Sequence, residues 1–267
     1  MQVHSRFPVL AIFVIAVLVM PCAFAESGTD DVLDYYVAAL IVQQDAKVRE
    51  VLSRVGGTGR RLLALRSYLR NDSKLEERWS WTQDQITAYE GSQEQRDLLQ
   101  EIDRVRAVFV ASNPGFDLYV NPQVRSLDTQ IEHWNTNASV AAAADGILAA
   151  VQALIASPGF AAAPSQKATD ALGLFLSGYT PVPRLPIAAP GLSAHGQMRE
   201  IDFQVHQGGR VVAGPRTATI ATDWEAGGWA AKLNAAVHAA SNRFVGPLAN
   251  PREPWHYTYT PKAVGAR

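Results

Sequence analysis

The hydrophobic pattern changes along this chain, and the change limits the folds that the chain can adopt. Between residues 30 and 110, apolar residues recur three or four positions apart, as Val48, Val51 and Val55 do, which indicates amphipathic helices. After residue 200, apolar and polar residues alternate, which is typical of half-buried strands. Helices first and antiparallel strands later favour an α+β protein. We therefore expect a small antiparallel sheet flanked by helices and preceded by a helical N-terminal segment.

The helical stretches have recognisable limits in the sequence. The first ends at the glycine-rich run Gly56–Gly59, because consecutive glycines interrupt a helical pattern. A second helix is predicted from about Arg60 to Arg70, and a third, rich in charged residues and glutamine, from about Leu75 to Val110. The charged side of the third helix is interpreted as a solvated face. Further helices are expected at residues 130–134, 138–155 and 168–176.

The predicted strands cover residues 116–120, 201–205, 210–213 and 255–259. Gly208 and Gly209 separate the second strand from the third and predict a hairpin turn. Asp223 is a residue type that caps helices, and we expect it to begin a helix that continues through Trp229. Four prolines between Pro181 and Pro190 predict an extended loop, because proline is excluded from the interior of helices and central strands.

The first 25 residues have the pattern of a secretory signal peptide. A weakly basic start with His4 and Arg6 is followed by the apolar run Phe7–Met20 and by an Ala-x-Ala cleavage site that ends at Ala25. The apolar run is too short, and too close to that site, to favour a permanent membrane helix. We therefore expect cleavage after Ala25, export to the periplasm or the exterior, and no stable membrane span in the mature protein.

Composition restricts the chemistry that the mature chain can perform. Cys22 is the only cysteine and lies in the predicted signal peptide. The mature protein is therefore expected to have no disulfide, and any metal must be bound by His, Asp or Glu. The 24 Lys and Arg residues are nearly balanced by 25 Asp and Glu residues. No broad basic field suggests nucleic acid as a partner.

Two short segments contain the residue types of a hydrolytic zinc site. His195 and Asp202 lie seven positions apart, and Glu253 and His256 lie three apart. Such a site has three protein ligands, an open position for water and a carboxylate base. Each pair alone is a weak signal. A His-x6-Asp spacing occurs by chance in many proteins, and the aromatic residues beside His256 can simply be core residues around a satisfied histidine.

In this order, the two segments resemble the zinc D-alanyl-D-alanine carboxypeptidases and dipeptidases of the vancomycin-resistance (VanY-like) type, whose scaffold the hedgehog signalling domain shares. The resemblance implies a zinc ion bound by His195, Asp202 and His256, with Glu253 as the catalytic base. It covers roughly residues 116–260.

A third segment also resembles this family. Leu118–Gln130 is similar to the family's strand and Tyr-Arg-Ser-x-x-x-Gln stretch, which implies that Arg125 and Gln130 approach the backbone and the terminal carboxylate of the substrate. The planar fork of an arginine suits bidentate binding of a carboxylate. Ser193, close to His195, is expected to help position the peptide. A surface salt bridge is the alternative interpretation of Arg125.

The chain departs from the family pattern at several positions. The family usually has His-x-x-Gly-x-Ala-x-Asp, and Met198 and Glu200 stand here at the Gly and Ala positions. Val124 replaces the usual tyrosine before the arginine. These differences alter the expected pocket shape but leave the expected ligands in place. The remaining histidines are expected to be structural or surface residues: His133, His206 and His238.

These observations lead to one expected organisation and function. The signal peptide (1–25) should be followed by a helical segment (26–112) and by a zinc peptidase domain (113–267) with an insertion at about 138–190. By resemblance, the substrate is the peptidoglycan stem peptide, and a D,D-carboxypeptidase that removes terminal D-Ala is expected. An L,D-carboxypeptidase or a cross-link endopeptidase would use the same centre. A zinc-containing module that binds cell wall or protein without cleavage is the alternative of another class.

Overall fold

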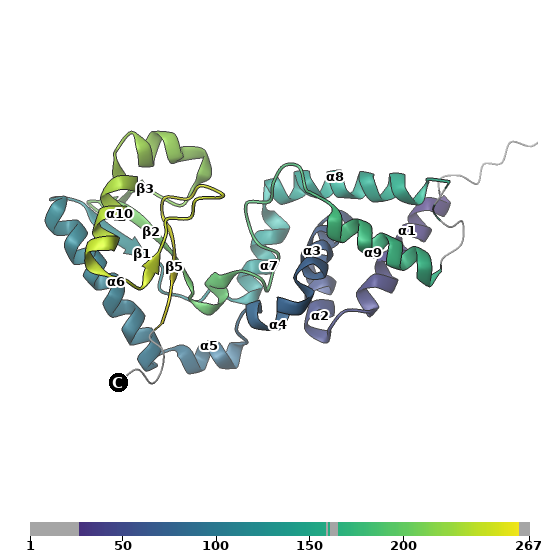
Figure 1. Ribbon diagram of the computed structural model, residues 1–267, viewed down its shortest axis with the longest axis horizontal. Coiled ribbons are helices and arrows are strands. Elements are labelled where there is room, and N and C mark those ends of the chain that lie inside the picture. The colour runs from purple at the N-terminus through teal and green to yellow at the C-terminus, as the bar shows by residue number, and fades with distance from the viewer. Residues whose placement is uncertain (1–26, 159, 161–164, 262–267) are drawn as a thin grey trace, which may run out of the picture.

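The computed structural model describes residues 27–158, 160 and 165–261, and it confirms the predicted α+β class (Figure 1). A small antiparallel sheet is flanked by helices and follows a helical N-terminal region. The predicted signal peptide, its cleavage site after Ala25 and Cys22 lie outside the described residues.

The N-terminal helices are shorter and more numerous than the hydrophobic pattern predicts. They are α1 (Ser27–Val42), α2 (Ala46–Arg54), α3 (Thr58–Asn71), α4 (Leu75–Arg78), α5 (Gln83–Tyr89) and α6 (Gln93–Ser112), with a 3₁₀ turn at Asp72–Lys74. The single helix predicted from Leu75 to Val110 is wrong. Thr82 caps α5 in a capping box, Gly91 adopts a left-handed conformation, and Ser92 caps α6. These caps begin new helices where periodicity alone suggests continuity.

The later helices largely follow the prediction. They are α7 (Leu127–Thr136), α8 (Ala138–Ile155), α9 (Gln166–Gly178) and α10 (Trp229–Ala240). The proline-rich stretch at 181–190 contains neither helix nor strand, as expected. Asp223 does not cap α10. It lies in a π-helical turn at Ile220–Glu225, and Gly228 is the N-cap residue of α10.

The sheet contains β1 (Asp117–Val120), β2 (Glu200–Gln207), β3 (Arg210–Ala213), β4 (Phe244–Val245) and β5 (His256–Tyr259). Its order is β1-β2-β5-β4, and β3 also pairs with β2. The turn at Gly208 and Gly209, both with positive φ, joins β2 to β3 as predicted. The short strand β4 was not predicted. β5 lies antiparallel to β2, so the last described strand pairs with the strand that follows the proline-rich loop.

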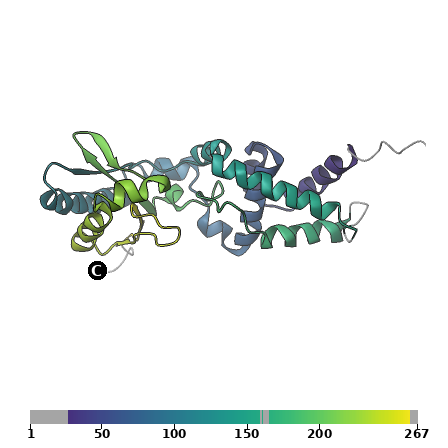
Figure 2. The ribbon, with the colours of Figure 1, turned by 90° about the horizontal axis from the view of Figure 1, so that it is seen from above.

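Two hydrophobic cores divide the molecule into two lobes, which lie side by side in Figures 1 and 2. The helical lobe is built from α1–α4 and α7–α9, around buried residues such as Tyr68 and Trp134. The sheet lobe combines the sheet with α5, α6 and α10, around residues such as Phe109, Phe203 and Tyr257. The boundary expected after residue 112 does not coincide with this division. α6 packs with the sheet, whereas the expected insertion packs with the N-terminal helices.

The chain crosses between the lobes at residues 79–82, 121–126 and 193–197. The buried side chain of Gln130 makes hydrogen bonds at or beside all three crossings. Its Nε2 donates hydrogen bonds to Ser80 Oγ and to the carbonyl oxygen of Arg125, each at 2.8 Å. Its Oε1 accepts one from the backbone N–H of Gly191 at 3.0 Å. Nearby, the backbone N–H of Trp81 donates to the carbonyl oxygen of Gly196 at 3.0 Å.

Among the described helices, α8 is long and apolar enough to cross a membrane. Length and composition are weak indicators, because the core helices of soluble proteins pass the same test. One face of α8 packs into the helical lobe, chiefly against α3, through Val140, Ala143 and Ile147. The feature is thus also explained by ordinary core packing.

The close packing around Gly196, at the third crossing, leaves no room for a side chain there. A Cβ at Gly196 would lie 2.2 Å from Ser80 Oγ and 2.8 Å from Gln130 Nε2. Gly196→Ala should therefore lower the free energy of unfolding by about 1–3 kcal/mol, as overpacking typically does. Gly178→Ala is the matched control, because a Cβ there meets nothing within 4 Å. Urea denaturation measures both variants, and equal midpoints would contradict the expected clash.

Candidate metal centre

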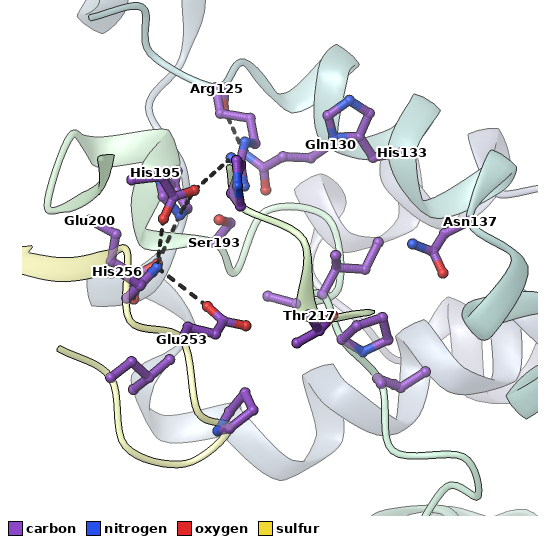
Figure 3. A pocket seen from close by; sticks show the side chains of 18 of the residues that line it. Arg125, Gln130, His133, Asn137, Ser193, His195, Glu200, Thr217, Glu253 and His256 are labelled. Carbon is purple, nitrogen blue, oxygen red and sulfur yellow. Dashed lines mark hydrogen bonds and ion pairs between the residues drawn. The ribbon is translucent and has the colours of Figure 1, made fainter. Parts of the chain in front are cut away.

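Four polar residues singled out in the sequence come together beside the third crossing. Figure 3 labels three of them, His195, Glu253 and His256. His195 lies in the short 3₁₀ helix at Ala194–Gln197, Asp202 lies on β2, and His256 is the first residue of β5. Glu253 lies in the turn before β5. Antiparallel pairing places Asp202 opposite His256. The fold thus joins the two sequence segments into one group.

Glu200 also belongs to this group, because side chains alternate along a strand. Glu200 precedes Asp202 by two positions on β2, so both carboxylates lie on the same face of the sheet. Glu200 Oε1 is 3.6 Å from His256 Nε2, and Glu200 Oε2 is 3.8 Å from His195 Nε2. The family pattern has an alanine here and gave no reason to expect a ligand. Strand alternation from Asp202 is the sequence signal that points to Glu200.

This group has the chemistry and the spacing of a metal site. His195, Glu200 and His256 each offer a ligand atom, and these atoms all lie within 4.8 Å of one another. With metal–ligand bonds of about 2.0–2.2 Å, the ligand atoms of a tetrahedral site lie about 3.3–3.6 Å apart. The observed separations are close to this value, and imidazole with carboxylate suits zinc and other divalent metals. These three residues can therefore hold a metal ion.

Asp202 contacts both histidines as well. Asp202 Oδ1 accepts a hydrogen bond from His256 Nδ1 at 2.9 Å, and its Oδ2 is 3.5 Å from His195 Nε2. The two ring nitrogens of His256 thus face different carboxylates. If His256 binds a metal through Nδ1, Asp202 completes the set with His195. If it binds through Nε2, Glu200 completes the set and Asp202 orients the ring from the opposite nitrogen.

The two histidines are driven toward opposite protonation states. Burial lowers the pKa of His195 to about 4, and the neighbouring positive charge of Arg125 acts in the same direction. Burial also disfavours charge on His256, but its contacts with Asp202 and Glu200 outweigh burial and raise its pKa to about 10. In the metal-free protein at neutral pH, His195 is therefore neutral, whereas His256 is protonated on both ring nitrogens and positively charged.

The carboxylates divide in a similar way. Burial opposes charge on Glu200 and Asp202, but the contacts with His256 and His195 prevail and lower the pKa of both carboxyl groups. Burial raises the pKa of Glu253, and the nearby charges of Asp202 and Glu200 add to this effect. Glu253 Oε2 lies 3.6 Å from His256 Nδ1. Glu253 is thus the carboxyl group of the site that most readily takes up a proton.

The expected substrate-binding residues Arg125, Ser193 and Gln130 lie around this group and differ in the contacts that they make. Arg125 Nη2 is 3.6 Å from Asp202 Oδ2, and the backbone N–H of Arg125 donates to the carbonyl oxygen of His195 at 3.3 Å. Ser193 lines the cavity beside His195. The amide of Gln130, 5% exposed, makes hydrogen bonds to Ser80, Arg125 and Gly191, at or beside the three crossings. Gln130 therefore holds the site together.

The group lies at one end of a cavity of about 740 Å³ formed by both lobes. This volume lies within the range of about 300–1,000 Å³ that is typical of ligand pockets. The sheet lobe contributes Glu253 and His256, and across the cavity the helical lobe contributes His133 and Asn137 (Figure 3). His133, predicted to be a structural or surface residue, lines the cavity. His206 lies apart from it, stacked on Tyr119 with ring centroids 5.2 Å apart.

Two isosteric substitutions distinguish the ligand set that contains Glu200 from the set that contains Asp202. Because Asp202 already makes a hydrogen bond of ordinary length to His256, we expect Glu200→Gln to weaken zinc binding by more than about 100-fold. Asp202→Asn should weaken it by about 10–100-fold, as loss of an orienting partner does. Chelator competition measures both, with the exposed Asp170→Asn on α9 as the control. The reverse order would favour Asp202 as the ligand, as the resemblance implies.

Metal uptake should also depend on pH in a defined direction. His256 must lose its proton to bind a metal, and its pKa is raised to about 10. Affinity should therefore increase by about tenfold per pH unit between about pH 6.5 and pH 8.5, with one proton released from His256. His195, with a pKa near 4, is already neutral there. Calorimetric titration in buffers of different ionisation enthalpy measures the released proton, and pH-independent affinity would contradict the expectation.

Comparison with known proteins identifies no relative of this chain. No protein-family model, curated protein or solved structure matches the chain. The resemblance to zinc D-alanyl-D-alanine carboxypeptidases thus rests on short motifs, and membership of that family remains a prediction.

Proposed function

We propose that the protein is an exported, zinc-dependent peptidase that acts on peptidoglycan stem peptides, and that it most closely corresponds to a D,D-carboxypeptidase. One observation carries the proposal. A group of two histidines and a carboxylate that can hold a metal opens onto a cavity, with Glu253 beside it. His195 and His256 would hold the zinc ion together with Glu200 or Asp202.

Bound zinc would supply Lewis-acid activation of water and of the scissile carbonyl. Glu253 would act as the general base, accept a proton from the attacking water and donate it to the leaving nitrogen. Hydrolysis thus produces a carboxylic acid and an amine. The raised pKa of Glu253 supports this role, because a base that must also return its proton works best with a pKa shifted toward the working pH.

The remaining residues would position the peptide. Arg125 lies next to the metal-holding group and can bind a terminal carboxylate through its guanidinium fork. Ser193 lines the same part of the cavity. Gln130 would act indirectly, since its hydrogen bond to the carbonyl oxygen of Arg125 holds that residue in place. The stem peptide is proposed as substrate because the motif resemblance and the predicted signal peptide agree on it.

One observation favours a second candidate function. Glu200 adds a carboxylate to the set implied by the resemblance, and four protein ligands typically close a zinc site for a structural role. If Glu200 and Asp202 both bind the metal, the protein would be a non-catalytic metal-containing module that binds cell wall or a protein partner. Glu253 argues against this candidate, because a binding module has no need of a base.

Digestion of a pentapeptide muropeptide tests the proposed function. Zinc-loaded protein should release one terminal D-Ala, and mass spectrometry of the products distinguishes a D,D-carboxypeptidase from an L,D-carboxypeptidase or an endopeptidase. Glu253→Gln should retain zinc and lose about 10²–10⁴-fold in activity, since it removes the general base. Equal turnover by that variant, or purified protein that binds no metal, would rule out the mechanism. Zinc binding without any cleavage would favour the non-catalytic module.

A further inference from the structure

Charge is unevenly distributed along the cavity. The three carboxylates that line it, Glu200, Asp202 and Glu253, lie 3.6, 2.9 and 3.6 Å from His256, at the end of the cavity where a metal can be held. Arg125 is paired with Asp202 and belongs to the same end. Among the described residues, the rest of the lining has no acidic side chain and includes three further arginines, namely Arg78, Arg184 and Arg216. The lining outside that end therefore carries only positive formal charge among the described residues.

These three arginines are not neutralised within the part of the chain that the structure describes. Arg78 Nη1 donates to Asn71 Oδ1 at 2.6 Å, and Arg184 Nη1 donates to Asn250 Oδ1 at 2.5 Å. Both acceptors are uncharged amides. Among the described residues, no carboxylate lies within 4.0 Å of the guanidinium of Arg78, Arg184 or Arg216. Like charges gathered in one concave site create a local potential that attracts anions.

Arg184 and Arg216 are contributed by different lobes. Arg184 lies in the proline-rich loop of the helical lobe, between Pro183 and Pro186, and Arg216 follows Pro215 in the loop after β3 of the sheet lobe. Proline fixes its own φ and restricts the preceding residue, so both loops are stiffened near the arginines. The hydrogen bond from Arg184 to Asn250 also joins the two lobes across the cavity. Stiff loops reduce the entropy that is lost when an anion is bound.

We propose that this part of the cavity is a subsite for a second anionic group of the substrate. The occupant is the side-chain or branch carboxylate of an acidic peptide, bound by Arg184 and Arg216 while the scissile bond lies at the metal-holding group. Guanidinium groups bind carboxylates through paired, charge-assisted hydrogen bonds. This inference rests on the proposed peptidase function and narrows its substrate class to acidic peptides. It also gives the helical lobe a role in recognition.

Two synthetic stem pentapeptides test the subsite. They are identical except that the glutamate residue carries either a free carboxylate or a carboxamide. Binding to zinc-loaded Glu253→Gln protein is measured by calorimetry, so that no turnover is needed. The free carboxylate should improve affinity by about tenfold, the size of one charge-assisted hydrogen bond. Arg184→Gln and Arg216→Gln in the same protein should each reduce this preference, while affinity for the carboxamide peptide stays unchanged.

Arg210→Gln is the matched control, because Arg210 is an exposed arginine of β3 that does not line the cavity. It should leave the preference intact. Equal affinity of both peptides for the parent protein, a preference that survives both cavity substitutions, or no binding of either peptide would overturn the subsite. Failure of the proposed function has a different signature. Wild-type protein would cleave neither peptide, although the carboxylate preference and its loss in the arginine variants are still observed.

Discussion

The arrangement of the two lobes depends on one buried side-chain amide. The chain crosses between the lobes three times, and Gln130 makes a hydrogen bond to a residue at or beside each crossing. Leaving a buried donor or acceptor without a partner costs about 1–3 kcal/mol, so the three segments can separate only with a penalty at each bond. Arg125 and Gly191 are held by this amide, and His195 lies a few residues beyond Gly191. The amide thus supports the candidate site through its hydrogen bonds.

The sequence predicts the elements better than it predicts their partners. The α+β class, the hairpin at Gly208 and Gly209 and the long helix α8 follow from periodicity and turn chemistry. The division into lobes does not, because an amphipathic stripe shows which face is buried but not what covers it. α6 has such a stripe and could have packed on the other N-terminal helices, but it packs on the sheet. Thr82 and Ser92 are residue types that cap helices, and these caps interrupt the helix that periodicity alone predicts.

The candidate site was predictable in part. Motif order pointed to His195, Asp202, Glu253 and His256, and the structure brings all four together. Glu200 departs from the family pattern, but its position two residues before Asp202 on a strand places it on the same face of the sheet. The commitment of Gln130 to the backbone of other segments could not be predicted, because it depends on contacts between residues far apart in the chain. The cavity arginines Arg78, Arg184 and Arg216 could not be predicted for the same reason, because they come from three separate segments of the chain.

The absence of cysteine from residues 27–267 gives the position of His195 a further meaning. His195 lies at the third crossing, whereas His256 lies on the strand at the centre of the sheet lobe. An ion bound by both would be a cross-link between distant parts of the chain, comparable to a disulfide, which residues 27–267 cannot form because they contain no cysteine. Metal binding to such a pair contributes directly to folding free energy. The residues that hold the ion would then also stabilise the junction between the lobes, and loss of the ion would loosen that junction.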